Sequence, residues 1–265
     1  MMEQSDNTLE DSRIYLLTYE MAEDNLAASA QSNMISYHKK LLELEQKQTD
    51  LELAREKYSL EQIKQGAGTA TAVDVLSSRE SMQGTENSLK ELESEIANVK
   101  ETLCISLGWK HNDTPEISAL PEADLSRIDG MDPDRDLETA VEHNYTLKIN
   151  KRKLENARSQ TTRESLETKI WNNEKQIGAS LSGAYKSVLS ARLSYEQALA
   201  AARLEEANTQ IAAGKLQAGM VTGLEYKEQQ YKMESSRLSA QMAAIELFQA
   251  METYDWSVKG LASAE

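Results

Sequence analysis

The residues that could carry catalytic or metal chemistry are few and far apart in this chain. Its three histidines, His38, His111 and His143, lack the short spacing that places two imidazoles around one metal ion. The sequence contains no glycine-rich phosphate loop and no nucleophile elbow. We interpret the histidines as surface or interface residues.

The remaining candidates also favour structural roles. Glu91, Glu93 and Glu95 lie on different faces if their segment is helical, so a solvated surface is a simpler interpretation than a metal cluster. Cys104 is the only cysteine, has no base motif beside it and cannot form an internal disulfide. We therefore predict no catalytic residue, no metal site and no cofactor, and we expect the chain not to be an enzyme.

The clearest motif indicates binding rather than catalysis. KQGAGTATAVDVL, residues 64–76, returns as KLQAGMVTGLEY, residues 215–226, at a displacement of 151 residues. The shared pattern is K-x-x-A-G-x-x-T-x-x-[DE]. The matched residues are Lys64, Ala67, Gly68, Thr71 and Asp74 in the first copy and Lys215, Ala218, Gly219, Thr222 and Glu225 in the second. The sequence thus predicts a duplicated helical hairpin.

Each residue type in this motif suits a turn between two helices. The glycines allow the backbone conformation that a tight turn needs. The threonines can cap the returning helix, and the acids then lie in its first turn, where the helix dipole favours negative charge. Any helical hairpin needs these features, so turn formation alone is one interpretation. The other interpretation is a docking surface, which two such turns exposed at one end of a bundle indicate.

The elements that must hold these turns are long helices. Charged residues make up 28% of the chain and aromatic residues only 5%, a composition typical of coiled coils. Residues 9–65 contain no Gly or Pro and repeat apolar residues at helical spacing, which predicts a rod of roughly 85 Å that starts at Thr8. The return segment, residues 71–107, carries an a/d seam. The seam consists of Val75, Met82, Leu89, Leu92, Ile96, Val99 and Leu103.

One irregular segment separates the two repeats. Residues 110–135 hold all three prolines, which predicts a turn-rich linker with a short strand or 3₁₀ piece at 117–120. A helix resumes at Asp136, with Asp134 or Asp136 as its cap. The expected domains are a first helical hairpin repeat at 1–109, an equatorial linker at 110–135, and a second repeat at 136–265.

The second repeat contains a rising helix followed by its hairpin. Clustered hydroxyls predict a reversal near 158–162, with Thr161 and Glu164 as a capping box, and then a long helix to about 217. An unbroken helix from 136 to 217 is the alternative. The last helix is expected from about 222 to 261.

Charge and hydropathy narrow the choice of partners. The formal net charge is -15, which argues against nucleic acid and against a helix lying on anionic lipid. No apolar run approaches the ~18 residues of a membrane-spanning helix. The N-terminal residues carry no signal segment, and the compartment cannot be inferred from them.

Several motifs resemble those of the TolC-like outer-membrane efflux protein family. AGTATAVDVL, residues 67–76, is similar to that family's hairpin-tip motif, Y-x-x-G-x-x-[ST]-x-x-D-[VL]-L. LCISLGW at 103–109 resembles its helix end, EISALPEAD at 116–124 its equatorial linker, and LETAVEHNYTLKINKRKLENA at 137–157 the helix that opens its second half. The family is also an internal duplication, and the resemblance covers about residues 50–262.

The resemblance implies an all-α protomer of a TolC-like α-barrel, with long antiparallel hairpins packed as coiled coils. It further implies a homotrimer that encloses a tunnel, a periplasmic membrane-fusion adaptor and an inner-membrane pump as partners, and a place in the extracytoplasmic cell envelope. The adaptor-facing rim would hold Gly68, Thr71, Asp74, Val75, Gly219, Thr222 and Glu225.

The sequence departs from the family at one place. The family has amphipathic strands between the rising and descending helices, where this chain has only RSQTTRES at 158–165. We therefore do not expect direct membrane insertion, and whether the chain is a shortened member or a natural relative that needs no outer membrane stays open. The alternative function is a structural coiled coil or adaptor-type hairpin that bridges partners without forming a channel. A membrane-curving helical module is a third interpretation, which the acidic charge disfavours.

Overall fold

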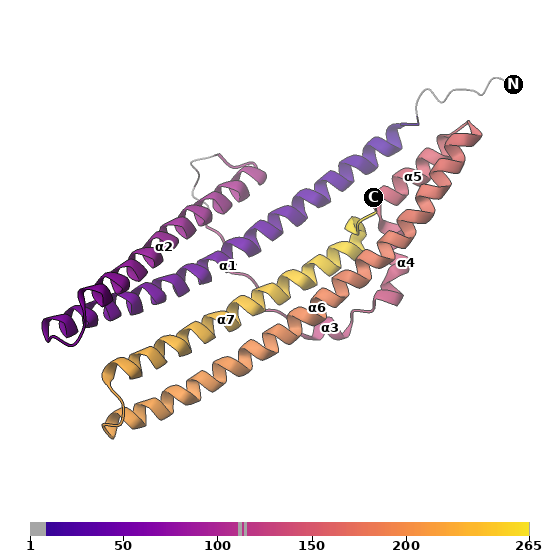
Figure 1. Ribbon diagram of the computed structural model, residues 1–265. Helices are drawn as coiled ribbons and strands as arrows, with labels where there is room; N and C mark the ends of the chain where they lie inside the picture. Colours follow the sequence, from indigo (N-terminus) through magenta and orange to yellow (C-terminus); the bar gives the residue numbers. More distant parts are fainter. Residues whose placement is uncertain (1–8, 111–112, 114–115, 265) are drawn as a thin grey trace. The chain divides into compact units, whose positions relative to one another are not determined.

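The computed structural model describes residues 9–110, 113 and 116–264, so Thr8 and His111 lie outside the described residues (Figure 1). Helices are the regular elements of this part of the chain, and the predicted all-α fold of long antiparallel hairpins is confirmed. The helices are α1 (Ser12–Gly66), α2 (Ala72–Ser106), α3 (Ser126–Asp129), α4 (Pro133–His143), α5 (Tyr145–Asn156), α6 (Gln160–Gln217), α7 (Gly223–Trp256) and the π-helical η1 (Ser257–Leu261).

The described residues form two compact units. Unit 1 combines the chain up to residue 32 with 122–192 and with the residues from 246 onwards. Unit 2 combines 33–121 with 193–245, and therefore contains both hairpin turns. The predicted division at residues 109 and 135 stays a prediction.

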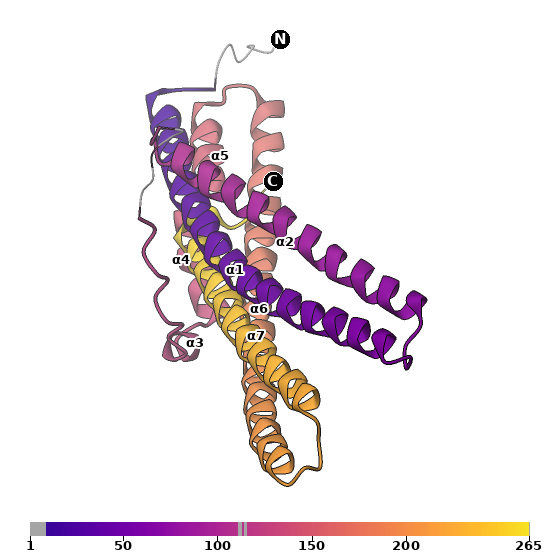
Figure 2. The same ribbon diagram turned by 90° about the vertical axis from the view of Figure 1, so that its left-hand side faces the viewer.

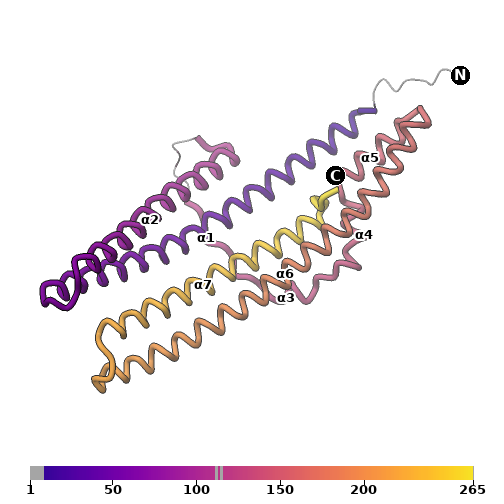
Figure 3. Tube along the Cα trace, in the orientation of Figure 1, coloured from indigo at the N-terminus to yellow at the C-terminus, as the bar shows by residue number. Residues whose placement is uncertain are grey.

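In unit 2, α2 lies antiparallel against α1 (Figure 3). Lys40 of α1 donates to Glu95 of α2 at 2.6 Å. Closer to the turn between these helices, Lys57 of α1 and Ser78 of α2 line the same shallow cleft. All seven residues of the predicted seam are buried or half-buried. Ser78 and Thr85 fill the polar heptad positions of the same face and are also half-buried. The seam therefore packs on α1 as its spacing predicted.

Helix α7 is covered on two sides in unit 2, since α1 lies along one and α6 along the other (Figure 2). The Thr209 hydroxyl of α6 lies 3.4 Å from the Gln229 carbonyl of α7, and Gln229 donates to Glu205 at 2.6 Å. On the other side, Gln46 of α1 donates to the Ser235 hydroxyl at 2.9 Å. Leu238, three residues after Ser235 on α7, is completely buried.

Unit 1 has a core of aliphatic side chains from α1, α4, α6 and α7, including Ile14, Ala140, Ile177, Leu247 and Met251. The reversal predicted near 158–162 is present, because α5 ends at residue 156 and α6 begins at residue 160. Arg163 of α6 donates back to the carbonyls of Leu154 and Ala157, both at 3.3 Å, which fixes this reversal.

A second break, at Asn144, was not predicted. Its buried side chain accepts from the Leu147 amide at 3.0 Å, and so caps α5. Its amide group donates to the carbonyls of Gly260 and Ala262 at 3.2 and 2.8 Å. Gly260 has φ +121, and a Cβ there would lie 2.6 Å from the His143 carbonyl oxygen. The C-terminal segment therefore needs glycine to reach the α4–α5 junction.

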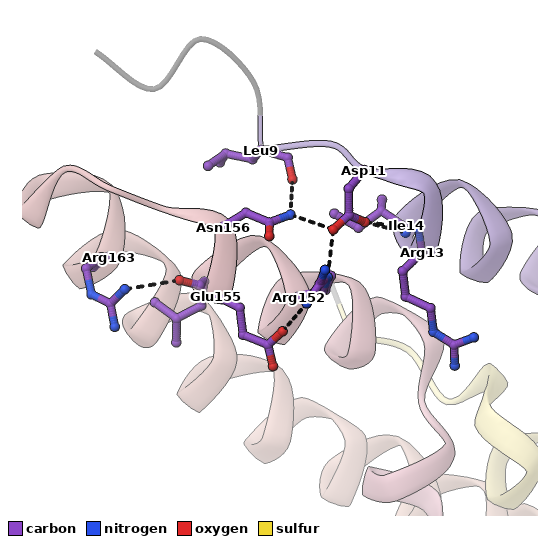
Figure 4. Close-up of polar contacts among 9 residues, drawn as sticks. Leu9, Asp11, Arg13, Ile14, Arg152, Glu155, Asn156 and Arg163 are labelled. Carbon is purple, nitrogen blue, oxygen red and sulfur yellow. Dashed lines mark hydrogen bonds and ion pairs between the residues drawn. The ribbon is translucent and has the colours of Figure 1, made fainter. Parts of the chain in front are cut away.

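The capping residues of α1, α4 and α6 differ from those predicted by two to four residues. Asp11 caps α1 by accepting from the amides of Arg13 and Ile14, both at 3.0 Å (Figure 4). Asp132 caps α4 in place of Asp134 or Asp136, with Pro133 at the first helical position. Ser159 accepts from the Thr162 amide at 3.2 Å, so the capping residue of α6 precedes the expected Thr161.

The linker was predicted only in outline. Residues 116–124 have no regular secondary structure, so the expected strand or 3₁₀ piece at 117–120 is wrong. A single-turn helix, α3, follows instead and buries Ile128. Arg127 of α3 donates to Glu252 and Asp255 of α7, both at 2.7 Å, and ties the linker to unit 1.

Candidate docking surface at the hairpin turns

The turn between α1 and α2 is closed by Gly68. This residue has φ +76, and its amide donates to the Gln65 carbonyl at 3.0 Å. The next amide, from Thr69, reaches back to the Lys64 carbonyl at 2.9 Å. This pair of bonds is a Schellman motif, which satisfies the last carbonyls of α1 and favours glycine at the left-handed position.

The turn between α6 and α7 repeats this geometry bond for bond. Gly219 has φ +67 and donates to the Leu216 carbonyl at 3.0 Å, and the Met220 amide donates to the Lys215 carbonyl at 2.8 Å. Each of these residues lies 151 positions after its counterpart in the first turn. The repeat is therefore one of backbone structure as well as of sequence.

Both returning helices begin with a capping box. Asp74 accepts at one carboxylate oxygen from the amide and the hydroxyl of Thr71, both at 2.8 Å, while its own amide donates to that hydroxyl at 3.2 Å. Glu225 accepts from the amide and the hydroxyl of Thr222 at 2.7 and 2.9 Å, and returns a bond of 3.2 Å. The predicted caps thus exist in reciprocal form.

The caps lower the pKa of both acids. The hydrogen bond from the Thr71 backbone amide lowers the pKa of Asp74, followed by that from the Thr71 hydroxyl and by the charge of Lys64. The same two bonds from Thr222 lower the pKa of Glu225. Both carboxylates are exposed. Each turn therefore presents one fixed negative charge to solvent.

The two turns lie at the same end of unit 2. Lys57 of α1 lies 3.0 Å from Glu228 of α7, and Glu56 accepts from Lys227. Gln46 of α1 contacts Ser235 of α7, and each of these residues lies farther from its own turn than Lys57 and Glu228 do. The two helices therefore run antiparallel in one register. The end of α1 thus lies beside the start of α7, and both turns extend from that end (Figures 1 and 3).

Exposed apolar side chains lie near these acids in the sequence. Met220 is 74% exposed in the second turn, and Val73 is 71% exposed in the first turn of α2. Ile63 and Leu76 are also exposed. Val75, predicted as a rim residue, is half-buried in the α2 seam. The sequence analysis missed Val73 and Met220. Val73 could have been found, because a helical projection with Val75 on the seam places Val73 on the exposed side of α2.

The structure accounts for two of the other polar candidates. His38 forms a hydrogen bond of 2.8 Å with the Ser118 carbonyl, and Cys104 is buried. Within the described residues, no three His, Cys, Asp or Glu side chains cluster closely enough to hold a metal ion. The same residues include no helix with an apolar stretch of bilayer-spanning length.

Solved structures of bacterial membrane proteins share the fold of this protein over most of its chain. A membrane protein from Pseudomonas aeruginosa matches with a TM-score of 0.70 at 12% identity, over 94% of this chain and 69% of that one. The outer membrane protein VceC from Vibrio cholerae gives 0.66 at 11%, over 93% and 72%. The CmeC outer membrane channel from Campylobacter jejuni gives 0.60 at 13%, over 94% and 65%. The sequence matches no protein-family model and no curated protein.

The chain therefore has the helical fold of bacterial outer-membrane channels. The resemblance to the TolC-like outer-membrane efflux protein family, found in the turn motifs, is confirmed by this shared fold. Among the solved structures with this fold, OprN and CmeC are outer-membrane channels.

Proposed function

We propose that this protein is a subunit of an envelope efflux or export conduit. Three copies associate into a helical tunnel, and the turns of each copy dock on a periplasmic membrane-fusion adaptor that leads to an inner-membrane pump. The subunit catalyses no reaction and acts in the extracytoplasmic envelope.

One observation carries this proposal: two turns with the same bonds, the same cap and the same charge extend from one end of unit 2. A single hairpin needs one such turn for its own closure. Two exposed copies at one end, with Val73 and Met220 beside them, form a repeated surface that suits a partner with repeated binding elements. The fold shared with outer-membrane channels supports the same role.

The shape and mass of the purified assembly test the conduit. We expect a mass of three chains by analytical ultracentrifugation, and a ring with a solvent-filled centre by electron microscopy. A monomer or a solid antiparallel bundle at all concentrations contradicts the conduit and supports the bridging coiled-coil alternative.

Docking is tested with variants that separate charge from capping. Asp74→Asn with Glu225→Gln removes both charges but keeps an oxygen for the cap, whereas Thr71→Val with Thr222→Val removes the capping hydroxyls and keeps both charges. We expect the first pair to weaken binding of the purified adaptor and the second to retain most of it. Charge reversal at the two acids should weaken docking further with overall helicity unchanged. Full docking by the charge-reversed protein would refute the rim assignment.

A further inference from the structure

The last described residues of the chain form an extended segment that packs on unit 1. We call residues 260–264 the C-terminal strap. Ala262 has φ −57 and ψ 137, so the backbone has left the helical conformation there. Ala262 and Ala264 are both 5% exposed, whereas Ser263 between them is exposed. The strap therefore turns small side chains into unit 1 at alternate positions, as a β-strand does on one face.

Buried asparagines hold the strap by its backbone. Asn144 donates to the carbonyls of Gly260 and Ala262 at 3.2 and 2.8 Å. Asn173 of α6 donates to the Ala264 carbonyl. The two asparagine residues are 1% and 3% exposed, and buried amide groups need hydrogen-bond partners. The strap supplies the acceptors for both of these side-chain amides.

The break between α4 and α5 lies against the strap. Asn144 has φ −60 and ψ 120, which turns the backbone out of the helix. The amides of Tyr145 and Thr146 therefore do not reach their helical acceptors in α4. The Leu147 amide bonds to the Asn144 side chain instead, at 3.0 Å. The break thus takes from Tyr145 and Thr146 the backbone bonds that a continuous helix would give them.

The local sequence does not require this break. Residues 141–147, VEHNYTL, contain no Gly or Pro, and Asn144 has helix on both sides. The strap, by contrast, is packed closely against it. A Cβ on Gly260 would lie 2.6 Å from the His143 carbonyl oxygen. In an unbroken helix this oxygen would accept from the Leu147 amide, so Gly260 contacts the acceptor of a bond that the break has removed.

We propose that the C-terminal strap holds the break at Asn144, and that α4 and α5 join into one continuous helix when the strap is displaced. The Asn144 side chain makes two bonds to the strap and one to the Leu147 amide. Displacing the strap removes the first two, whereas joining the helices returns helical acceptors to the three amides of residues 145–147.

The strap is then a conformational device within unit 1. A segment more than a hundred residues away in the sequence sets the direction in which α4 continues into α5. The proposal concerns unit 1 alone, and so it does not depend on the assembly or the docking proposed above.

Asn144 by itself is the competing cause of the break. Asparagine is a favoured N-cap residue, and the bond from the Leu147 amide does not involve the strap. A variant that displaces the strap and keeps Asn144 separates the two causes.

Gly260→Ala is that variant. Its Cβ would collide with the His143 carbonyl, and φ +121 is unfavourable for alanine, so the strap must shift. We expect hydrogen exchange at the amides of Tyr145 and Thr146 to become about tenfold slower or more, because both amides gain helical acceptors. Loosened packing without a joined helix would leave their exchange unchanged or make it faster. Either of these results overturns the proposal and assigns the break to Asn144.

Two substitutions serve as controls. Asn173→Ala releases the Ala264 end of the strap and keeps both bonds of Asn144, so exchange at the same two amides should stay at the wild-type rate. Gly84→Ala adds a methyl group at an open helical site of α2 and should also have no effect there. Equal slowing in either control would contradict a specific action of the strap on the break.

A chain shortened after residue 259 tests the same proposal without a steric clash. The Cα chemical shift of Asn144 reports its backbone conformation, and should move from an extended to a helical value when the strap is absent. The wild type gives a result that needs no variant. Its Tyr145 and Thr146 amides should exchange faster than that of Lys148, which donates to the Asn144 carbonyl at 3.0 Å. An extended value for Asn144 in the shortened chain overturns the proposal, and so does equal protection of the three amides in the wild type.

Discussion

Glu225 accepts hydrogen bonds from both the amide and the hydroxyl of Thr222, at 2.7 and 2.9 Å, just as Asp74 does from Thr71 151 residues earlier. This reciprocal bonding fixes the first turn of α7 beside an exposed loop. The start of α7 therefore depends on the hydroxyl of one threonine.

Replacing Thr222 with Ala should loosen the start of α7. The lost hydroxyl leaves the Glu225 amide without its capping acceptor, which costs about 1 kcal/mol. Hydrogen exchange at the amides of residues 224–226 should then become about fivefold faster, because these amides exchange through local opening. Thr222→Ser keeps the hydroxyl and should exchange like wild type. Equal acceleration in both variants would show that the hydroxyl does not hold the turn.

Replacing Gly219 with Ala should destabilise the second turn without any steric clash. A Cβ on Gly219 would meet no atom within 4 Å, so the cost comes from the backbone, whose φ is +67. We expect a loss of about 1–2 kcal/mol in the free energy of unfolding. Gly183→Ala, a helical glycine with equally open surroundings, should instead add about 0.5–1 kcal/mol. Urea denaturation measures both, and a neutral Gly219→Ala would contradict the assigned turn.

Asn144→Leu should be one of the most damaging single changes in unit 1. It keeps a similar volume but leaves the Leu147 amide and the carbonyls of Gly260 and Ala262 without their bonds. The expected loss is about 2–4 kcal/mol in the free energy of unfolding, because buried polar groups left unpaired are costly. Asn172→Leu, at an exposed site on α6, should change stability by less than about 0.5 kcal/mol. Similar effects of the two changes would show that Asn144 does not hold the C-terminal segment.

Acid should release the contact that Asp11 makes with α5 (Figure 4). The bond from the Asn156 side chain is the largest of the effects that lower the pKa of Asp11 to about 2, from an ordinary 3.8, and the bond from Arg152 adds to it. A carboxyl group with a lowered folded-state pKa stabilises the fold fully above its unfolded pKa, and loses that contribution as pH falls through the folded value.

The stability of the wild type should therefore fall between about pH 4 and pH 2, and part of that fall should be missing in Asp11→Asn. Denaturation midpoints measured across this range make the comparison. Asp134→Asn, whose side chain makes no bond in the described part of the chain, is the control and should keep the wild-type slope. Parallel curves for the Asp11 variant and the wild type would exclude this linkage.

The local features of this fold could be predicted from sequence, because they depend on residues close together in the chain. The glycine turns, the Thr–acid caps and the α2 seam all follow from spacing over a few residues. The exact starts of α1 and α4 could not be predicted, since several Ser, Thr and Asp residues near each start can serve as caps. The break at Asn144 depends on carbonyls more than a hundred residues away, and no local glycine or proline signals it.

The candidate docking surface was predicted in position but not in composition. The sequence identified the acids and glycines, which shape the turns. It missed Val73 and Met220, which are exposed, and it included Val75, which is half-buried in the α2 seam. The side of α6 that packs on α7 could not be identified by periodicity alone, because apolar residues follow heptad spacing on more than one side of this helix. Only the placement of α7 shows which side is covered.

The distance between the two turns tests the account most directly. Spin labels at Thr69→Cys and Met220→Cys, one in each turn and 151 residues apart, report this distance by pulsed electron paramagnetic resonance. Neighbouring hairpins with both turns at one end predict a distance within about 30 Å, because packed helix axes lie about 10 Å apart. A distance near 80 Å, about the length of α1, would place the turns at opposite ends and contradict the duplicated hairpin.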